Sequence, residues 1–165
     1  MTDSNKKLTG RIELRPVIMP DDDDFLKALY FTSREDAHLL PEEIKEAFLT
    51  MQYTAQKAHY EEHFNIAWHY IVMYDGQAIG RYWVDYRDDE IRLIDIALLP
   101  EYRGIGIGSI ILKDTMKEAA ETSRPYTLHA MQEGRSVKFY EKLGFHIVGE
   151  AGMHHLMEWK PLETK

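Results

Sequence analysis

The stretch LLPEYRGIGIGS, residues 98–109, decides the fold because it joins a strand to a helix through a glycine-rich turn. Pro100 ends the apolar run before the turn, and helically spaced apolar residues follow Ser109 to about residue 120. Three glycines stand at every second position: Gly104, Gly106 and Gly108. Glycine lets a backbone approach a phosphate closely, and the first N–H groups of a helix attract anions. The stretch therefore predicts an anion-binding turn.

The spacing of these glycines separates the turn from two common nucleotide motifs. A dinucleotide fingerprint needs Gly-x-Gly-x-x-Gly near the first strand of a βαβ unit, and a P-loop needs Gly-Lys-Ser/Thr. Residues 104–109 match neither pattern and lie in the middle of the chain. Two alternatives stay open at this point, a glycine-rich turn without a ligand and a nucleotide-binding protein of another fold.

Composition limits the class of protein. A chain of 165 residues with 44% hydrophobic residues predicts one domain, residues 11–165, behind a polar tail, residues 1–10. No apolar run approaches the length of a membrane span, so we expect no membrane partner and a cytoplasmic protein. A net charge of −8 argues against nucleic acid as a partner and would attract a cationic amine. With no cysteine, the chain has no disulfide, thiolate metal site or cysteine nucleophile.

Hydrophobic patterning around the turn predicts an α/β fold. The expected strands are residues 11–15, 67–74, 78–86, 90–98, 126–131, 146–149 and 154–159. The expected helices begin at residue 25, run from 41 to 63 and from 109 to 120, and run from 133 to 143 with Gly144 as the stop. Four acids, residues 21–24, are expected to cap the first helix. The order implies a mixed, mostly antiparallel sheet of about seven strands flanked by about four helices.

A second motif lies about 30 residues after the turn, in SVKFYEKLGF, residues 136–145. Together the two segments resemble the signatures of the GNAT superfamily of acyl-CoA-dependent N-acetyltransferases, over roughly residues 10–160. The matching positions are Arg103, Gly106 and Gly108 in the first segment, and Tyr140, Gly144 and Phe145 in the second.

The resemblance implies where acetyl-CoA would bind. The strand before the turn would splay from its neighbour and pair with the pantetheine arm through Ile96, Ala97 and Leu98. The pyrophosphate would be held by Arg103, Gly104, Ile105, Gly106, Ile107, Gly108 and Ser109. Glu133 departs from the family, which usually has asparagine at this place, so its help to the coenzyme is in doubt.

The implied reaction is direct attack of an amine on the thioester. Tyr140 is the candidate acid for the departing thiolate, because a phenol stays protonated at neutral pH. Asp95, an acid within an apolar strand, is the first candidate for the base. Tyr140 could instead only anchor its helix in the core, and Asp95 could pair with Arg81, Arg92 or a backbone group. Two other acids, Glu90 and Glu13, stay open as bases.

The histidines do not predict a metal site. His154 and His155 are adjacent on a strand and point to opposite faces, while His59 and His63 bring no third ligand from nearby sequence. The expected acceptor is a primary amine of a small molecule or peptide, recognised by residues 33–62 and 149–159. A non-catalytic acyl-CoA sensor with the same fold is the alternative, and the apolar strands allow a homodimer.

Overall fold

The structure is a computed structural model that describes residues 4–34, 37, 39–64 and 67–162. The chain divides into two compact units. The first unit comprises Met1–Tyr82 and Ala97–Arg103, and the second comprises Trp83–Ile96 and Gly104–Lys165. The strands are hydrogen-bonded in the order β1-β2-β3-β4-β5-β6-β8-β7, with β4 and β5 contributing residues to both units.

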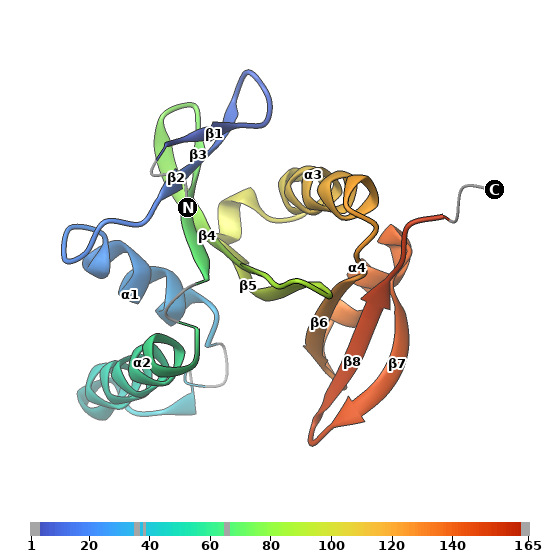
Figure 1. Cartoon of the computed structure of the whole chain (residues 1–165). Helices are drawn as coiled ribbons and strands as arrows, with labels where there is room; N and C mark the ends of the chain where they lie inside the picture. Colours follow the sequence, from blue (N-terminus) through green and yellow to red (C-terminus); the bar gives the residue numbers. More distant parts are fainter. Residues whose placement is uncertain (1–3, 35–36, 38, 65–66, 163–165) are drawn as a thin grey trace. The chain divides into compact units, whose positions relative to one another are not determined.

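The first unit combines short strands with two helices, α1 and α2, that lie side by side (Figure 1). Its elements are β1 (Lys6–Lys7), β2 (Ile12–Pro16), α1 (Asp23–Thr32), α2 (Glu42–His63), β3 (Trp68–Tyr74), the first part of β4 (Gln77–Tyr86), the end of β5 (Ile91–Leu98) and the 3-10 helix η2 (Pro100–Tyr102). β2 pairs antiparallel with both β1 and β3. β2 ends at Pro16, and the N–H of Val17 donates one further backbone bond of 3.0 Å to the carbonyl of His69.

Leu26, Tyr53 and Ile71 form a buried cluster that joins α1, α2 and β3. Each large apolar side chain that is fully buried contributes roughly 1.5–3 kcal/mol. The phenol of Tyr53 also donates a 2.8 Å hydrogen bond to Asp23, at the start of α1. Apolar burial and this polar contact together hold α2 against α1.

Asp23 and Asp24 lie in the first turn of α1, where their charges favour the helix dipole as predicted, but the predicted capping bond is absent at Asp22. Asp22 is the N-cap residue, but its carboxylate makes no capping bond. It instead accepts hydrogen bonds from the Arg15 guanidinium, at 2.8 and 3.0 Å, and from the N–H of Ile18. Arg15 consequently holds the pKa of Asp22 below its usual value. The charged partner takes the carboxylate away from the helix end, so the capping prediction is wrong for this residue.

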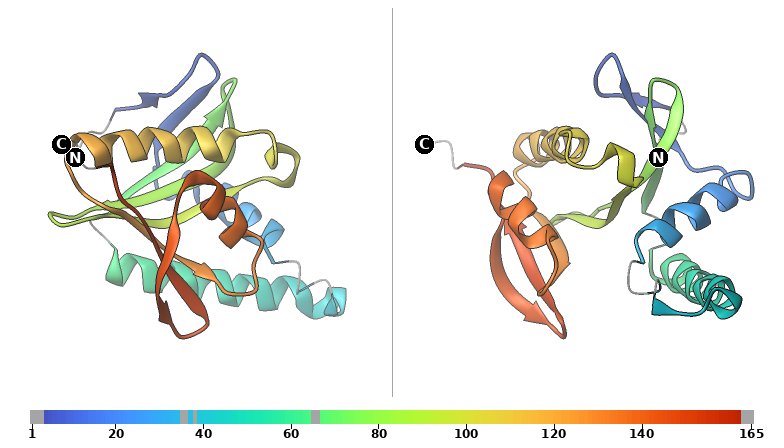
Figure 2. Two further views of the ribbon diagram at one scale, coloured as in Figure 1. Left: turned by 90° about the vertical axis from the view of Figure 1, so that its right-hand side faces the viewer. Right: turned by 180° about the vertical axis from the view of Figure 1, so that it is seen from behind.

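The second unit carries the other two helices, and Figure 2 shows α3 as one straight helix beside the twisted β7–β8 hairpin. Its elements are the end of β4, most of β5, α3 (Ile107–Glu121), β6 (Tyr126–Met131), α4 (Ser136–Leu143), β7 (His146–Ala151) and β8 (His154–Trp159). β6 and β7 both pair antiparallel with β8, whereas β5 and β6 are parallel. Gly144 ends α4 with φ +104°, the left-handed conformation typical of a helix stop.

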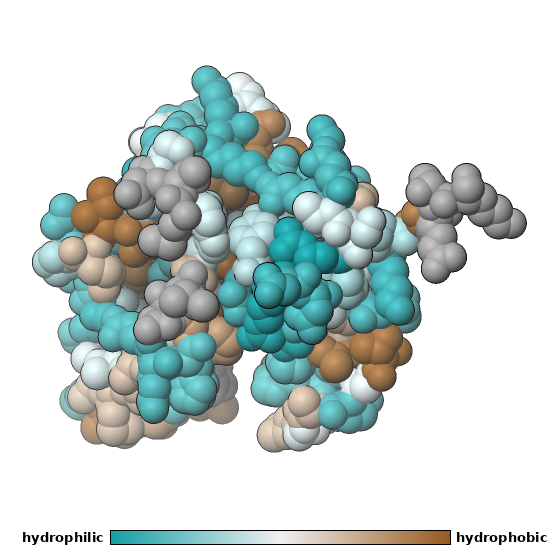
Figure 3. Space-filling model, viewed as in Figure 1, coloured by the Kyte–Doolittle hydropathy of each residue, from teal (hydrophilic) through white to brown (hydrophobic). Residues whose placement is uncertain are grey.

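Among the residues that the structure describes, eight strands, most of them antiparallel, and four α-helices confirm the predicted fold class, with one strand more than expected. The extra strand is β1, within the segment predicted to be a polar tail. The prediction of a single domain stays a prediction. Exposed apolar side chains such as Leu39 and Met153 are separated along the chain, and the face drawn in Figure 3 is mostly hydrophilic with separate apolar patches. Within the described ranges, no helix is both long and apolar enough to cross a membrane.

Candidate active site

The glycine-rich turn gives α3 an open N-terminus. Gly104 and Gly106 adopt φ +75° and +94°, conformations that other residues rarely take, and Gly106 is the N-cap of α3. The first turn of α3 has no acidic residue. The leading N–H groups of a helix have no partner within the helix and carry the positive end of its dipole. The start of α3 can therefore bind an anion through backbone N–H groups.

The other residues that are predicted to hold the pyrophosphate differ in how far they are buried. Ile107 is buried and fixes the first turn of α3 in the core, whereas Ile105 is 61% exposed. Gly108 and Ser109 are half-buried in the same turn of the helix. Arg103, in the first unit, is exposed and its Nε donates a 2.9 Å hydrogen bond to the carbonyl of Leu98. That bond spans the segment between the end of β5 and the turn.

β5 and β6 separate within the second unit. Their parallel ladder joins Ile91–Leu93 to Tyr126–Leu128 and ends there, although β5 continues to Leu98 and β6 to Met131. β6 remains paired with β8 as far as Met131. Strands that part while both stay extended expose backbone groups to which another extended chain can bond. Ile94, Asp95 and Ile96 stand on the part of β5 beyond the ladder.

Three elements of the second unit meet at Gly108. A Cβ atom at this position would lie 3.4 Å from Cζ of Phe139 on α4 and 4.0 Å from Cδ1 of Ile96 on β5. The start of α3 is thus packed next to the separated end of β5 and next to the helix that carries Tyr140. The structure thus brings together two of the predicted site residues, Ile96 and Gly108.

Tyr140 lies in an aromatic cluster and is only 7% exposed. Its ring centroid is 5.7 Å from that of Phe145 and 5.3 Å from that of Phe139. Burial raises the pKa of the Tyr140 phenol above its ordinary value, and the negative charge of Asp95 adds to this effect. Tyr140 consequently stays protonated throughout the neutral range and can donate a hydrogen bond.

Asp95 is half-buried on β5. The two arginines that the sequence offered as its partners have other bonds. Arg92 donates to Thr127 and Glu90, and Arg81 donates to Gln56 at 3.3 Å. Asp95 acts on Tyr140 through its charge, so the two candidate catalytic residues belong to one electrostatic environment.

Glu133 does not lie on α4, contrary to the sequence prediction. The helix begins at Ser136, and Glu133 is exposed in the turn that follows β6. Gly134 stands between them and accounts for the later start, because glycine weakens a helix. The predicted stripe through Glu133 and Tyr140 is therefore wrong. Of the two alternative bases, Glu90 is engaged by Arg87, Arg92 and Thr127, and Glu13 is half-buried on β2 in the first unit.

Ala97 and Leu98 belong to the first unit, where sequence analysis missed a close strand contact. A Cβ at Gly80 on β4 would lie 2.3 Å from the carbonyl oxygen of Ala97 and 3.1 Å from the Cα of Leu98. Only glycine fits this approach. A lone glycine inside a strand is a signal for such a contact, and it could have been noticed in the sequence.

A stack of side chains in the first unit reaches the residue before Arg103. The guanidinium of Arg11 lies 4.5 Å from the ring centroid of Tyr74, and that ring meets Tyr102 edge-on at 5.7 Å. Arg11 is also paired with the exposed Asp75. These contacts fix Tyr102 in η2, and no pattern in the sequence indicates them.

The histidine pairs behave as separate surface groups. His155 contacts Glu150 at 2.8 Å, while His154 lies beside His129 with ring centroids 6.4 Å apart. The rings of His59 and His63 are 4.2 Å apart on α2. In the part of the chain that the structure describes, no group of three His, Cys, Asp or Glu side chains is arranged to hold a metal ion.

Comparison with known proteins agrees with this geometry. A family model described as an acetyltransferase (GNAT) domain matches residues 66–147. YjcF of Bacillus subtilis (strain 168), an uncharacterized N-acetyltransferase, is 33% identical over 100 residues, which span 55% of this chain and 69% of that protein.

Solved structures share the fold. The PaiA N-acetyltransferase of Thermoplasma acidophilum, in complex with coenzyme A, has a TM-score of 0.68 and 21% identity, over 90% of this chain and 98% of that one. A GNAT family acetyltransferase of Elizabethkingia anophelis with acetyl-CoA bound has a TM-score of 0.56 and 17% identity, over 92% and 99%. The family model, the relative and the shared fold together place the chain in the GNAT family of acetyltransferases.

Proposed function

We propose that this protein transfers the acetyl group of acetyl-CoA directly to a primary amine of a small molecule or peptide. The observation that carries the proposal is the separation of β5 from β6 after Leu93, within the unit whose α3 begins at a glycine-rich turn. An extended ligand with a diphosphate matches both features. The neighbours crystallised with coenzyme A and acetyl-CoA support the same donor.

The coenzyme would be held mainly by backbone groups. The pantetheine arm would pair with the backbone of Ile96, Ala97 and Leu98, as an added strand does. The pyrophosphate would accept hydrogen bonds from the N–H groups of residues 103–109, from Arg103 through the three glycines to Ser109. Glu133, which is exposed in its turn, would contact at most the edge of the arm.

The proposed chemistry needs a path for one proton. The amine nitrogen attacks the thioester carbon, the C–S bond breaks, and the coenzyme leaves as a thiolate. Tyr140 would give its proton to this thiolate, and Asp95 would draw the proton from the new ammonium group through water. That proton then restores the phenol, so the net result is an amide and a free thiol. The raised pKa keeps the Tyr140 phenol protonated until the thiolate forms, and the same shift makes the phenol a weaker acid toward that thiolate.

The test combines binding with turnover. Calorimetry should show binding of acetyl-CoA, and a panel of primary amines should include acceptors that release free thiol with saturation kinetics. Binding without thiol release from any amine would favour the alternative, an acyl-CoA sensor. A preference for NAD or ATP over acetyl-CoA would contradict the proposal. The homodimer, the absence of nucleic acid and membrane partners, and the cytoplasmic location stay predictions.

A further inference from the structure

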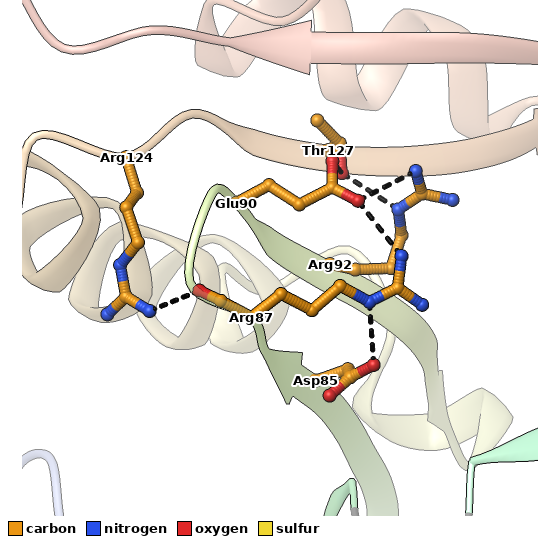
Figure 4. Close-up of polar contacts among 6 residues, drawn as sticks. All are labelled: Asp85, Arg87, Glu90, Arg92, Arg124 and Thr127. Carbon is orange, nitrogen blue, oxygen red and sulfur yellow. Dashed lines mark hydrogen bonds and ion pairs between the residues drawn. The ribbon is translucent and has the colours of Figure 1, made fainter.

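A buried polar cluster joins β5 to β6 at the point where the two strands are still paired. It consists of Glu90, Arg92 and Thr127, here called the clasp (Figure 4). Thr127 donates a 2.7 Å hydrogen bond to Glu90 Oε2, and its oxygen accepts a 2.8 Å bond from Arg92 Nε. Arg92 Nη2 returns to Glu90 Oε1 at 3.2 Å. The three side chains thus close a ring of hydrogen bonds across the two strands.

The clasp is shielded from water. Thr127 is 4% exposed, and the side chains of Glu90 and Arg92 are 18% and 17% exposed. Hydrogen bonds between charged groups are stronger in such surroundings than at the surface, and removal of one partner leaves the others unsatisfied. Burial acts to raise the pKa of Glu90, but the hydrogen bond from Thr127 and the charges of Arg92 and Arg87 hold it below its usual value. The ring of bonds is therefore costly to disturb.

The clasp is anchored beyond the two strands. Arg87 bonds to Glu90 at 3.0 Å and to the buried Asp85 of β4 at 2.8 Å. Arg124, which precedes β6, donates a 2.7 Å bond to the carbonyl of Arg87. Figure 4 shows this network running from the end of β4 through the β4–β5 turn to β6. These bonds fix the beginning of β5 relative to both of its neighbours.

The clasp lies one residue pair before the point at which β5 and β6 separate. Arg92 and Thr127 face each other in the middle pair of the three-residue ladder, and Leu93 with Leu128 forms the last pair. Leu93 and Leu128 are buried, so apolar packing and the clasp hold the same short ladder. Beyond the ladder β6 stays paired with β8, as it does along the ladder itself. The strands consequently part at one defined residue.

We propose that the clasp sets the point at which β5 and β6 separate, and that Thr127 is a positioning residue for the pantetheine arm. This inference rests on the proposed function, because it assumes that the arm enters between the separated strands. Loss of the Thr127 hydroxyl would let the ladder slip or lengthen, and the exposed backbone would no longer match the arm. The pyrophosphate site would be unaffected, since it consists of the turn before α3.

Two ligands distinguish the place where the pantetheine arm would bind from the pyrophosphate site. Coenzyme A contains the pantetheine arm, and 3′-phosphoadenosine 5′-diphosphate is the same molecule without it. In Thr127→Val the dissociation constant of coenzyme A, measured by calorimetry, should rise about tenfold. That of the truncated ligand should stay as in the parent protein. Thr127→Ser keeps the hydroxyl and should restore tight binding, while Thr54→Val, at an exposed threonine of α2, is the matched control.

A second variant covers the case in which Thr127→Val does not fold. Arg92→Lys keeps a positive charge beside Glu90 but cannot reproduce the Nε bond to Thr127, so it should show the same selective loss. Equal weakening of both ligands, or no change in either, would overturn the inference. If the parent protein bound only the truncated ligand, this inference would fail while the anion site stood. If it bound neither, the proposed function would fail first.

Discussion

The carboxylate of Asp95 on β5 raises the pKa of the Tyr140 phenol on α4, adding to the effect of burial. The two residues lie 45 positions apart in the sequence, and the fold of the second unit brings the Tyr140 phenol within the electrostatic influence of the Asp95 carboxylate. The proposed reaction requires a group that stays protonated until the thiolate forms, and the raised pKa of Tyr140 meets this requirement. This pairing makes several consequences measurable.

Replacement of Tyr140 by Phe removes the proposed acid and keeps the aromatic ring. The turnover number should fall about a hundredfold or more, because general acid catalysis contributes on this scale. The KM for acetyl-CoA should change little, since the phenol acts after binding. Steady-state kinetics at several pH values would check this. Unchanged turnover at saturating acetyl-CoA across the pH range would remove Tyr140 from the mechanism.

Replacement of Gly106 by Ala places a side chain on the N-cap of α3. The backbone has φ +94° there, and an L-residue in the left-handed region costs roughly 1–2 kcal/mol. Because Gly106 belongs to the proposed pyrophosphate site, coenzyme A should bind about tenfold or more weakly. Gly76→Ala, in the β3–β4 turn at φ +81°, carries a similar strain and is the matched control. A comparable loss of coenzyme affinity in both variants would contradict the assignment of residues 103–109 as the pyrophosphate site.

Gly80→Ala should destabilise the first unit by about 3 kcal/mol, because overpacking against backbone atoms cannot be relieved by a rotamer change. The new Cβ would meet the carbonyl oxygen of Ala97 at 2.3 Å. Urea unfolding would measure the loss. Gly10→Ala is the control, since a Cβ at Gly10 would meet nothing within 4 Å. Equal stability of the two variants would show that β4 and β5 do not approach as described.

His69 predicts how stability depends on pH. Burial, together with the charge of Arg81, lowers the pKa of His69 from 6.5 to about 3. As the pH falls below about 6.5, the unfolded chain gains a proton that the folded chain cannot bind, so the free energy of unfolding falls by up to about 1.4 kcal/mol per pH unit. His69→Gln should flatten the profile between pH 6.5 and 3 in urea unfolding. His146→Gln, at an exposed histidine, is the control. A parent-like slope in His69→Gln would refute this account.

The features that the sequence predicted well depend on neighbours along the chain. The turn at Gly104 and Gly106, the helix after it and the stop at Gly144 all follow from glycine conformations and apolar spacing within a few residues. The two motifs identified the family for the same reason. The residues assigned to the donor half of the site stay a prediction.

The features that were missed depend on residues far apart in the sequence. β1 is two residues long and exists because it pairs with β2. The bond between Arg92 and Thr127 spans 35 positions and follows from the register of two strands. The helical spacing that predicts Glu133 on α4 continues through Gly134, although glycine has a low helix propensity. The register of two strands cannot be read from the residue pattern of a single segment. The sequence therefore held no signal for the clasp.

The most direct test of the central claim is the identity of the product. The parent protein would be incubated with acetyl-CoA and the best primary amine of the panel, and the acceptor analysed by mass spectrometry while thiol release is followed. We expect N-acetylated amine and free coenzyme A in equal amounts, with both lost together in Tyr140→Phe. Tight binding of acetyl-CoA with no acetylated amine from any acceptor would contradict the claim.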